Sequence, residues 1–377
     1  DTVSAEVIRE VPGRNPVGRI TKVTVPATKD IVGVFHTKKT GGYVVPDDER
    51  FKRNIEIPAD KVVPGRRSGK SPAGPKEGQF VLVRRERWED PKQDPTGKVL
   101  EILGNPEDQG IETLIIAKSK GLRTEFPKKV LESADRLSMP KAKNERKRRL
   151  DLRDTLCFTI DPESAKDFDD AVSLTQLDNG RFELGVHIAD VSYYVEENSP
   201  IDKEARERGT SIYFVDQVIP MLPERLSNDL CSLRQGEDRL AFSVLMEIDS
   251  LGTVVDYRIR ETIIRSNRRF TYKEVEDIIE GREKKKDLPY VKTVHQMTML
   301  SRVLRKAREE KGSIDFDIPV PVISVDKDGI PYEVGPSERI EANRLVEEFM
   351  LAANLTVARH MIARNKHIAE KLSGGKK

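Results

Sequence analysis

The sequence contains little cysteine and no long apolar run. Cys157 and Cys231 are too few for a disulfide framework and lie outside any Cys/His spacing typical of a metal site, so we expect buried thiols in a cytoplasmic protein. No run of about 18 or more apolar residues occurs, and residues 1–10 do not have the charged and apolar regions of a signal peptide. These absences exclude a disulfide-rich secreted protein and argue against a membrane partner.

Charge is distributed unevenly along the chain. Residues 1–150 carry 32 Lys+Arg against 22 Asp+Glu, a net charge of +10, whereas residues 151–377 carry 34 against 42, a net charge of −8. A basic front half suits a polyanion such as nucleic acid. The acidic back half would repel that polyanion unless some of its carboxylates hold cations. The alternative is that charge merely drifts along the chain.

Short apolar alternations, separated by Gly, Pro and charged residues, run from Ile31 to Leu103. They predict five or so short strands, which suit a closed barrel of the OB or cold-shock type. Such barrels commonly receive single-stranded nucleic acid on an exposed sheet face, although a fold alone does not establish binding. The basic, Gly/Pro/Ser-rich stretch 64–76 predicts a surface loop that either meets phosphates or is simply solvated.

Residues 106–150 predict a helical linker that ends in the basic run KAKNERKRRL. Arg148 and Arg149, at its end, either contact phosphates or belong to an ordinary solvated face.

A mixed domain follows, so the fold class is multidomain α+β, with a barrel before a mixed α/β domain. Its predicted elements are strands from Thr155, a DNG hairpin at 178–180, an antiparallel pair around SLGT, helices near 273–281 and 291–311, and a long amphipathic helix from about 340.

Four aspartates lie close together in TIDPESAKDFDDA, namely Asp161, Asp167, Asp169 and Asp170. Packed without partners they would repel one another, so such a loop normally needs a cation. Mg²⁺ is the natural candidate because it prefers oxygen ligands and is usually held by a few carboxylates plus a substrate phosphate. Two such ions can activate a water and stabilise a leaving oxygen. The alternatives are a structural calcium loop, whose usual spacing is absent, or an exposed acidic turn without a ligand.

Several segments together resemble the catalytic domain of ribonuclease II-type exoribonucleases. They are, in order, TIDPESAKDFDDA, GVHIADVSYYV, TSIYFVDQVIPMLPERLSNDLCSL, GSIDFD and NRLVEEFMLAAN. The preceding barrel, with GVFHTKKTGGYVVPDD and GKVLEILG, is similar to the second cold-shock domain of bacterial ribonuclease R. The resemblance spans essentially the whole chain. It implies a remnant of a first cold-shock domain at 1–24, a second at 28–105, a helical basic linker at 106–150, and the N-terminal part of the catalytic domain at 151–377.

The resemblance implies a magnesium-dependent, processive exoribonuclease. Such an enzyme removes nucleotides one at a time from the 3′ end of single-stranded RNA and releases nucleoside 5′-monophosphates. The resemblance assigns catalysis and the binding of one or two Mg²⁺ ions to the four aspartates, with Asp161 and Asp170 as direct ligands and Mn²⁺ as a substitute. We expect a monomer. The competing hypothesis is a non-catalytic RNA-binding protein with the same fold.

The resemblance also assigns RNA contacts. Tyr213, in TSIYF, matches an aromatic residue that stacks near the scissile end, and Phe316, in GSIDFD, matches one that clamps the terminal bases from the other side. Stacking tolerates any base and contributes about 1–3 kcal/mol per base. Glu347, in VEEF, corresponds to an acidic residue that contacts the RNA end.

In the barrel, Phe35 and Tyr43 are candidates for stacking on bases. This stacking is expected to be weak because IEI at 55–57 stands where cold-shock domains often place an aromatic residue. His187 is left outside the site, since a lone His on an apolar strand is more often a hydrogen-bonded core residue. The family pattern continues to a T-S-P-I-R-R-Y-type segment, whose arginine is expected to stabilise charge on the phosphate. We therefore expect a chain truncated at both ends, whose activity by itself depends on that segment.

Overall fold

The structure is a computed structural model, and it describes most of the chain. The two compact units are called here the barrel unit and the sheet unit. The barrel unit comprises Asp1–Glu125, Ile212–Ile219 and Ser324–Glu333, and the sheet unit comprises Phe126–Ser211, Pro220–Ile323 and Val334–Lys377. The described residues are 2–10, 13, 15–25, 30–62, 74–86, 93–140, 142–215, 217–314, 321–326, 331–336 and 339–374.

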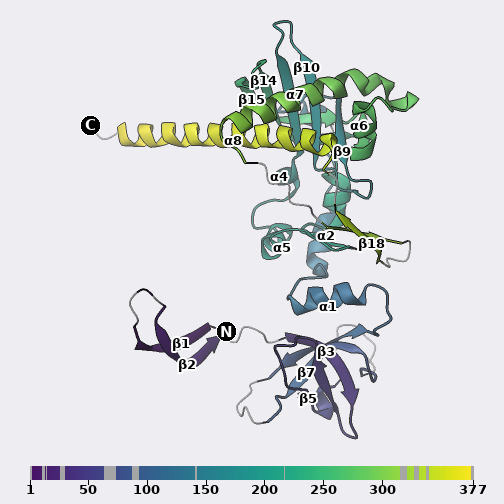
Figure 1. Ribbon diagram of the computed structural model, residues 1–377, viewed down its shortest axis with the longest axis vertical. Coiled ribbons are helices and arrows are strands. Elements are labelled where there is room, and N and C mark those ends of the chain that lie inside the picture. Colours follow the sequence, from purple (N-terminus) through teal and green to yellow (C-terminus); the bar gives the residue numbers. More distant parts are fainter. Residues whose placement is uncertain are drawn as a thin grey trace. The chain divides into compact units, whose positions relative to one another are not determined.

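The barrel unit is built on a five-stranded antiparallel sheet of order β5-β4-β3-β6-β7 (Figure 1). A bridge between Glu56 and Thr96 joins β5 to the residue before β7, which closes the sheet as predicted. Gly42 has no side chain for a steric reason, because a Cβ there would lie 2.4 Å from the buried ring of Phe35. The strands are β3 (Asp30–Thr37), β4 (Gly42–Pro46), β5 (Ile55–Ile57), β6 (Phe80–Arg85) and β7 (Gly97–Gly104), with the short helix η1 (Ala59–Lys61) after β5.

One helix packs against this barrel. Ile111 and Ile115 of α1 (Ile111–Ser119) form a small core with Val32 of β3. The first part of the predicted linker therefore belongs to the same compact unit as the barrel. The chain also forms three two-stranded sheets, which are β1 (Thr2–Arg9) with β2 (Val17–Val25), β12 (Ile212–Tyr213) with β13 (Val218–Ile219), and β17 (Pro321–Val325) with β18 (Pro331–Pro336).

The sheet unit is organised around a seven-stranded sheet of order β16-β9-β10-β11-β14-β15-β8. The central pairs are antiparallel, whereas β16 pairs with β9, and β8 with β15, in parallel. The predicted DNG hairpin joins β10 to β11, and its Gly180 has φ +82°, which favours glycine. The strands are β8 (Leu150–Asp151), β9 (Cys157–Asp161), β10 (Asp170–Gln176), β11 (Phe182–Ala189), β14 (Asp238–Ile248), β15 (Val254–Arg265) and β16 (Arg268–Thr271).

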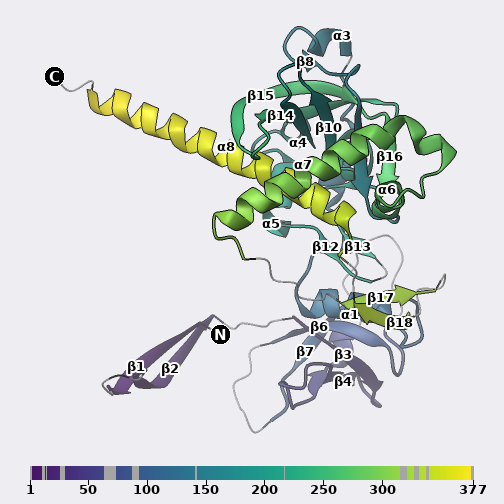
Figure 2. The same ribbon diagram turned by 45° about the horizontal axis from the view of Figure 1, so that its top comes forward.

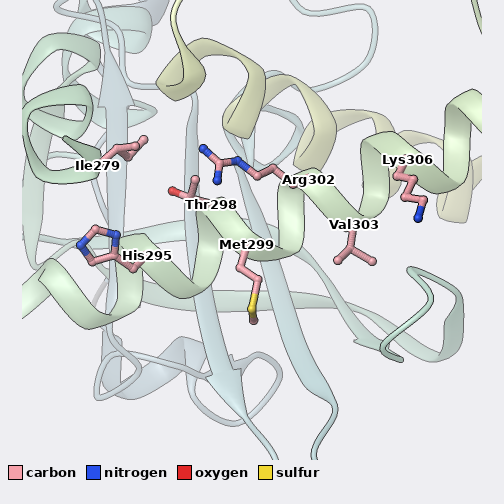
Figure 3. A pocket seen from close by; sticks show the side chains of 7 residues that line it. All are labelled: Ile279, His295, Thr298, Met299, Arg302, Val303 and Lys306. Atoms are coloured by element: carbon pink, nitrogen blue, oxygen red, sulfur yellow. The ribbon is translucent and has the colours of Figure 1, made fainter.

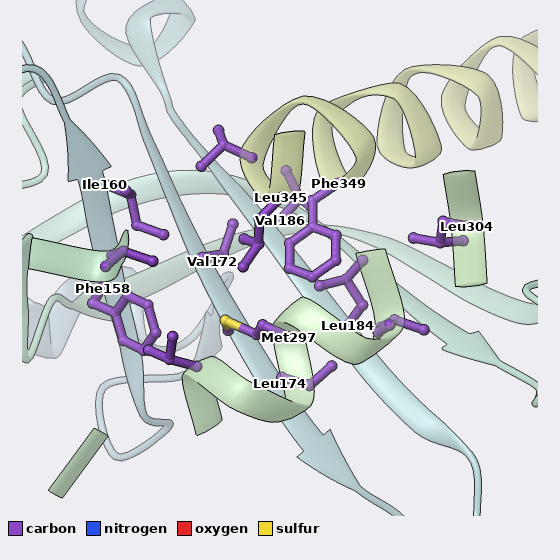
Figure 4. Close-up of a cluster of buried hydrophobic side chains, with 14 of the residues drawn as sticks. Phe158, Ile160, Val172, Leu174, Leu184, Val186, Met297, Leu304, Leu345 and Phe349 are labelled. Carbon is purple, nitrogen blue, oxygen red and sulfur yellow. The ribbon is translucent and has the colours of Figure 1, made fainter. Parts of the chain in front are cut away.

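Three helices cover one face of this sheet, as Figure 2 shows for α7 and α8. In Figure 4, Phe349 of α8 and Met297 of α7 point toward the strand residues Val172, Leu184 and Val186. The predicted helices near 273–281 and 291–311 are confirmed, and the apolar stripe of each faces the sheet. The three helices are α6 (Tyr272–Ile279), α7 (Val291–Glu310) and α8 (Glu341–Gly374), and η3 (Lys285–Tyr290) precedes α7.

The opposite face packs on a second core that includes Cys157, Ala171 and Cys231. Both cysteines are buried and free, as predicted, and burial raises the pKa of each thiol to about 12. The elements on this side and before the sheet are α2 (Lys128–Asp135), α3 (Ala142–Glu145), α4 (Val191–Tyr194), α5 (Pro200–Arg208) and η2 (Arg225–Leu230). None of the helices in the described ranges combines the length and apolar character needed to cross a bilayer.

Candidate active site

The four aspartates gather at one end of the seven-stranded sheet. Asp161 is the last residue of β9 and Asp170 is the first residue of β10, its antiparallel neighbour. The connecting loop, 162–169, carries Asp167 and Asp169. Because the ends of adjacent antiparallel strands meet, the fold places at one end of the sheet aspartates that are up to nine positions apart in the sequence.

Backbone contacts fix the end of this loop against its neighbours. The N–H of Ala189, at the end of β11, donates to the carbonyl of Asp169 at 2.9 Å. The N–H of Leu233 donates to the carbonyl of Phe168 at 2.8 Å, and Phe168 packs against the second core. These bonds fix the backbone of Phe168 and Asp169 where the loop enters β10.

The site is desolvated and electrostatically crowded. Burial, with a smaller contribution from the charges of Asp170 and Asp167, raises the pKa of Asp161 to about 6. Partial desolvation also raises the pKa of Asp169 to about 6, with repulsion from Asp167 and Asp170 added, although its side chain still reaches solvent. Burial raises the pKa of Asp170 as well. Crowded carboxylates of this kind favour a bound cation.

The donor set suits a hard divalent cation. Asp161 is 7% exposed, and its Oδ2 is buried without a hydrogen-bond partner among the described residues. A buried, unpaired carboxylate oxygen is costly unless something compensates it, and Mg²⁺ takes oxygen ligands of this type. Within the described ranges, however, no three His, Cys, Asp or Glu residues already form a group that could hold a metal ion. The residue types fit the ion, and the side chains are not gathered into a finished ligand set.

Comparison with known proteins gives the family. A family model described as RNB domain matches residues 149–369, which is more than half of the chain. The chain belongs to the RNB-domain family. A second model, described as Cold shock domain, matches residues 43–127. The predicted kinship with ribonucleases of this type and the predicted order of a cold-shock-type barrel before the larger domain are confirmed.

Curated and solved relatives agree with this assignment. Ribonuclease R of Aquifex aeolicus is 43% identical over 363 residues, which are 96% of this chain and 50% of that protein. The structure of Mycoplasma genitalium RNase R in complex with ribose methylated single-stranded RNA aligns with TM-score 0.87 at 26% identity, over 97% of this chain and 56% of that chain. Yeast Ssd1, a pseudonuclease, shares the fold with TM-score 0.66 at 18% identity, over 95% and 44% of the two chains. The chain thus spans about half the length of the curated relatives it matches.

In this RNB-domain protein, the predicted RNA-contact residues Tyr213 and Glu347 differ in their element and in their exposure. Tyr213 is 67% exposed in the short hairpin β12–β13, which belongs to the barrel unit. Glu347 lies on α8 with its side chain 42% exposed, and Arg339 Nη2 donates to its Oε2 at 2.7 Å. Phe316 lies outside the described residues. Tyr213 and Glu347 are accessible to a ligand.

The two candidates for base stacking in the barrel, Phe35 and Tyr43, differ in burial. Phe35 is 1% exposed in the barrel core, which leaves no face for stacking, so it is a packing residue instead. Tyr43 is half-buried on the sheet, and its ring stacks on His36 at 5.0 Å between centroids with an interplanar angle of 21°. Lys38 Nζ lies 5.0 Å from the centroid of the Tyr43 ring. Tyr43 therefore lies in a cluster with His36 and Lys38, and Lys38 Nζ also pairs with Glu56 Oε1 at 2.7 Å.

The two arginines before β8 have unlike environments. Arg149 has a fully buried side chain that donates to Asp190 Oδ2 at 2.6 Å and to Glu145 Oε2 at 3.1 Å. A phosphate cannot reach it, so Arg149 is a structural ion-pair residue rather than an RNA contact. Arg148 is about half exposed and is paired with Glu261 and Glu145. It remains open to solvent on one side.

His187 is a buried, hydrogen-bonded core residue, as predicted. Its Nε2 lies 2.9 Å from Ser173 Oγ and its Nδ1 lies 2.8 Å from Ser243 Oγ. Burial lowers its pKa to about 4, so the ring is neutral at pH 7. These contacts use both ring nitrogens and leave none for a metal or substrate.

Three residues near the aspartates have no signal in the local sequence pattern. Ser232 and Arg269 bond to the loop, and Tyr272, at the start of α6, lies near Asp161 and Asp170. Burial, with a smaller contribution from the two carboxylates, raises the pKa of Tyr272 to about 12. All three lie more than 60 positions from the loop, so only the fold reveals them.

A cavity of about 380 Å³ on the outer side of α7 is separate from this site. Figure 3 shows His295, Met299, Arg302 and Lys306 of α7 around it, with Ile279 of α6 at one end. None of the four aspartates lines the cavity. The four aspartates, at the acidic end of the sheet, are therefore not part of this cavity.

Proposed function

We propose that this chain carries the metal-binding half of a 3′-to-5′ exoribonuclease site that hydrolyses single-stranded RNA. The observation that carries the proposal is the meeting of four aspartates at the end of β9 and β10, with the buried Oδ2 of Asp161 unpaired within the described part of the chain. Relatives named Ribonuclease R at 37–43% identity support the reaction class. Processive release of nucleoside 5′-monophosphates belongs to the same proposal.

The four aspartates differ in exposure, and we assign their roles on that basis. Asp161 and Asp170, which are more withdrawn from water, would hold Mg²⁺, or Mn²⁺ in its place. The ion would supply charge for the phosphate oxygens and a site for the attacking water. Asp169 reaches solvent, and its carboxylate can orient that water and accept its proton. Asp167, on the same loop, adds negative charge beside Asp161 and Asp169.

RNA would be held by surfaces of both units. Tyr43, with Lys38 beside its ring, offers a stacking position on the barrel, and exposed Tyr213 offers another. Phe316 and Glu347 would contact the 3′-terminal nucleotides, and Arg148 a backbone phosphate. Stacking and charge contacts of this kind do not distinguish bases, which suits an enzyme that digests any sequence. We propose a monomer acting in the cytoplasm.

The test is a time course of 3′- and 5′-labelled single-stranded RNA with Mg²⁺ or EDTA. Stepwise shortening from the 3′ end that EDTA stops is the expected result. Asp169→Asn should reduce hydrolysis by about 10²–10⁴-fold and leave RNA affinity nearly unchanged, because the carboxylate acts in the chemical step. Asp256→Asn, at an exposed position of β15, is the matched control and should have no effect. Equal loss of binding and hydrolysis in Asp169→Asn would refute the assigned role.

The second candidate is an RNA-binding protein that does not cut. The shared fold of yeast Ssd1, a pseudonuclease, favours keeping it, because the architecture occurs without nuclease activity. The same time course separates the two. RNA that is bound with Mg²⁺ present but never shortened would select the binding function for this chain.

A further inference from the structure

One side chain spans the two ends of the aspartate loop. Arg269 lies on β16, which runs parallel to β9 and places Arg269 opposite Thr159. Its Nη2 donates to the carbonyl of Pro162 at 2.6 Å and to the carbonyl of Glu163 at 2.9 Å, directly after Asp161. The same guanidinium lies 5.5 Å from the ring centroid of Phe168, the residue before Asp169. Arg269 thus contacts both the start and the end of the loop.

A buried serine holds the loop from a different element. Ser232 follows η2 and is fully buried. Its Oγ accepts a hydrogen bond from the N–H of Phe168 at 3.1 Å and donates to the carbonyl of Lys166 at 3.1 Å. These bonds flank Asp167. Together, Arg269 and Ser232 fix the backbone on both sides of the loop's own carboxylates.

The environment of Arg269 combines a buried donor with nearby negative charge. Its Nε is buried and has no partner among the residues described, although an unsatisfied buried donor costs about 1–3 kcal/mol. An unmet group of this kind in a native protein calls for an explanation, such as an ordered water or a functional role. The positive charge beside Asp161 also offsets repulsion among the aspartates. A cation that bonds two carbonyls and balances acidic neighbours suits a support for a metal-binding loop.

We propose that Arg269 and Ser232 are positioning residues that hold the 162–169 loop in the shape its carboxylates need to bind a divalent cation. This inference rests on the proposed function. A loop that is already ordered loses less conformational entropy when the cation gathers its side chains. Residues that support metal ligands typically contribute about 10–100-fold in metal affinity.

The test measures metal binding directly, by Mn²⁺ electron paramagnetic resonance with this 377-residue chain. Arg269→Lys keeps the charge, but one compact ammonium cannot bond the Pro162 and Glu163 carbonyls and also lie over the Phe168 ring, as the extended planar guanidinium does. Ser232→Ala removes one oxygen. Each variant should weaken Mn²⁺ binding by about 10–100-fold. Arg258→Lys is the matched control, because Arg258 lies in the same sheet and pairs on the surface with Glu183 at 2.7 Å. The Mn²⁺ affinity of this variant should equal that of the wild type.

The outcomes separate this inference from the function on which it rests. Wild-type affinity in Arg269→Lys and Ser232→Ala, with loss in Asp161→Asn, would overturn the positioning role and keep the metal site. Absence of Mn²⁺ binding by the wild-type chain would overturn both. Circular dichroism shows whether each variant is folded. Should Arg269→Lys not fold, Ser232→Ala decides by the same criterion.

Discussion

Asp161 is a buried carboxyl group, and burial disfavours its charged form. Its titration therefore couples the stability of the metal-free fold to pH. A carboxyl whose pKa is raised to about 6 in the fold binds protons more tightly there than in the unfolded chain. The metal-free fold therefore loses stability as pH rises from about 4 to about 6, and the loss is complete above that range. A bound cation would restore what ionisation removes.

Asp161→Asn should stabilise the metal-free chain. Removing the charge should raise the free energy of unfolding at pH 7 in EDTA by about 1–2 kcal/mol, a value reduced from the full two-unit shift because the new amide is itself buried. At pH 4 the difference should nearly vanish, since wild-type Asp161 is then protonated. Urea denaturation at both pH values measures this. A variant that is less stable than wild type at pH 7 would contradict the account.

Sequence patterns predicted the aspartates but not their supports. Clustered carboxylates within one loop are visible in the sequence, and their spacing indicates a cation site. The contacts of Ser232 and Arg269 join residues 64 and 107 positions apart, so no local pattern reports them. The burial of Arg149 against Asp190 is of the same kind, and it is why a basic run that looks suited to phosphate includes a structural residue.

At the scale of elements, α6 begins beside the aspartates. Thr271 is the last residue of β16, stands opposite Asp161, and caps α6. Its hydroxyl accepts from the N–H of Glu274 at 3.1 Å, while the Glu274 side chain accepts from the N–H of Thr271 at 3.0 Å. This reciprocal pair fixes where the strand turns into the helix.

Thr271→Ala should lower the free energy of unfolding by about 1 kcal/mol, because the first turn of α6 loses a side-chain acceptor. Thr175→Ala, at an exposed position of β10, is the control and should change stability less. Urea denaturation of the two variants measures the difference. Equal destabilisation would show that the cap contributes nothing beyond the loss of a threonine.

Elements were predictable where one local rule decides them. The DNG turn and the alternation beside it gave β10 and β11, and helical spacing gave α6 and α7. The region 106–150 was predicted as a linker because its own residues do not reveal that Ile111 and Ile115 pack on Val32. The predicted surface loop at 64–76, for which the sequence leaves both phosphate contact and simple solvation open, falls mostly outside the described residues.

At the scale of the whole molecule, the uneven charge distribution makes RNA binding depend on salt concentration and RNA hydrolysis depend on the divalent cation. The front 150 residues carry the net charge of +10, and the aspartates lie in the acidic remainder. Phosphates bound by Lys and Arg release counterions, so affinity should fall as salt rises, with a slope of about −0.7 per phosphate neutralised on a log–log plot. Hydrolysis should require the cation, whereas binding should survive its removal.

This expectation is tested with fluorescently labelled single-stranded RNA at several salt concentrations, in Mg²⁺ and in EDTA. EDTA should leave the affinity and the salt slope unchanged, because the barrel surface around Tyr43 and Lys38 contains no part of the cation site. Lys39→Glu, at an exposed position after β3, should reduce the slope by about 0.7, whereas Lys292→Glu on α7 should not. Affinity that falls sharply in EDTA would instead mean that the aspartates and their cation hold the RNA. Binding would then depend mainly on the acidic half, and the basic half would contribute little beyond solubility.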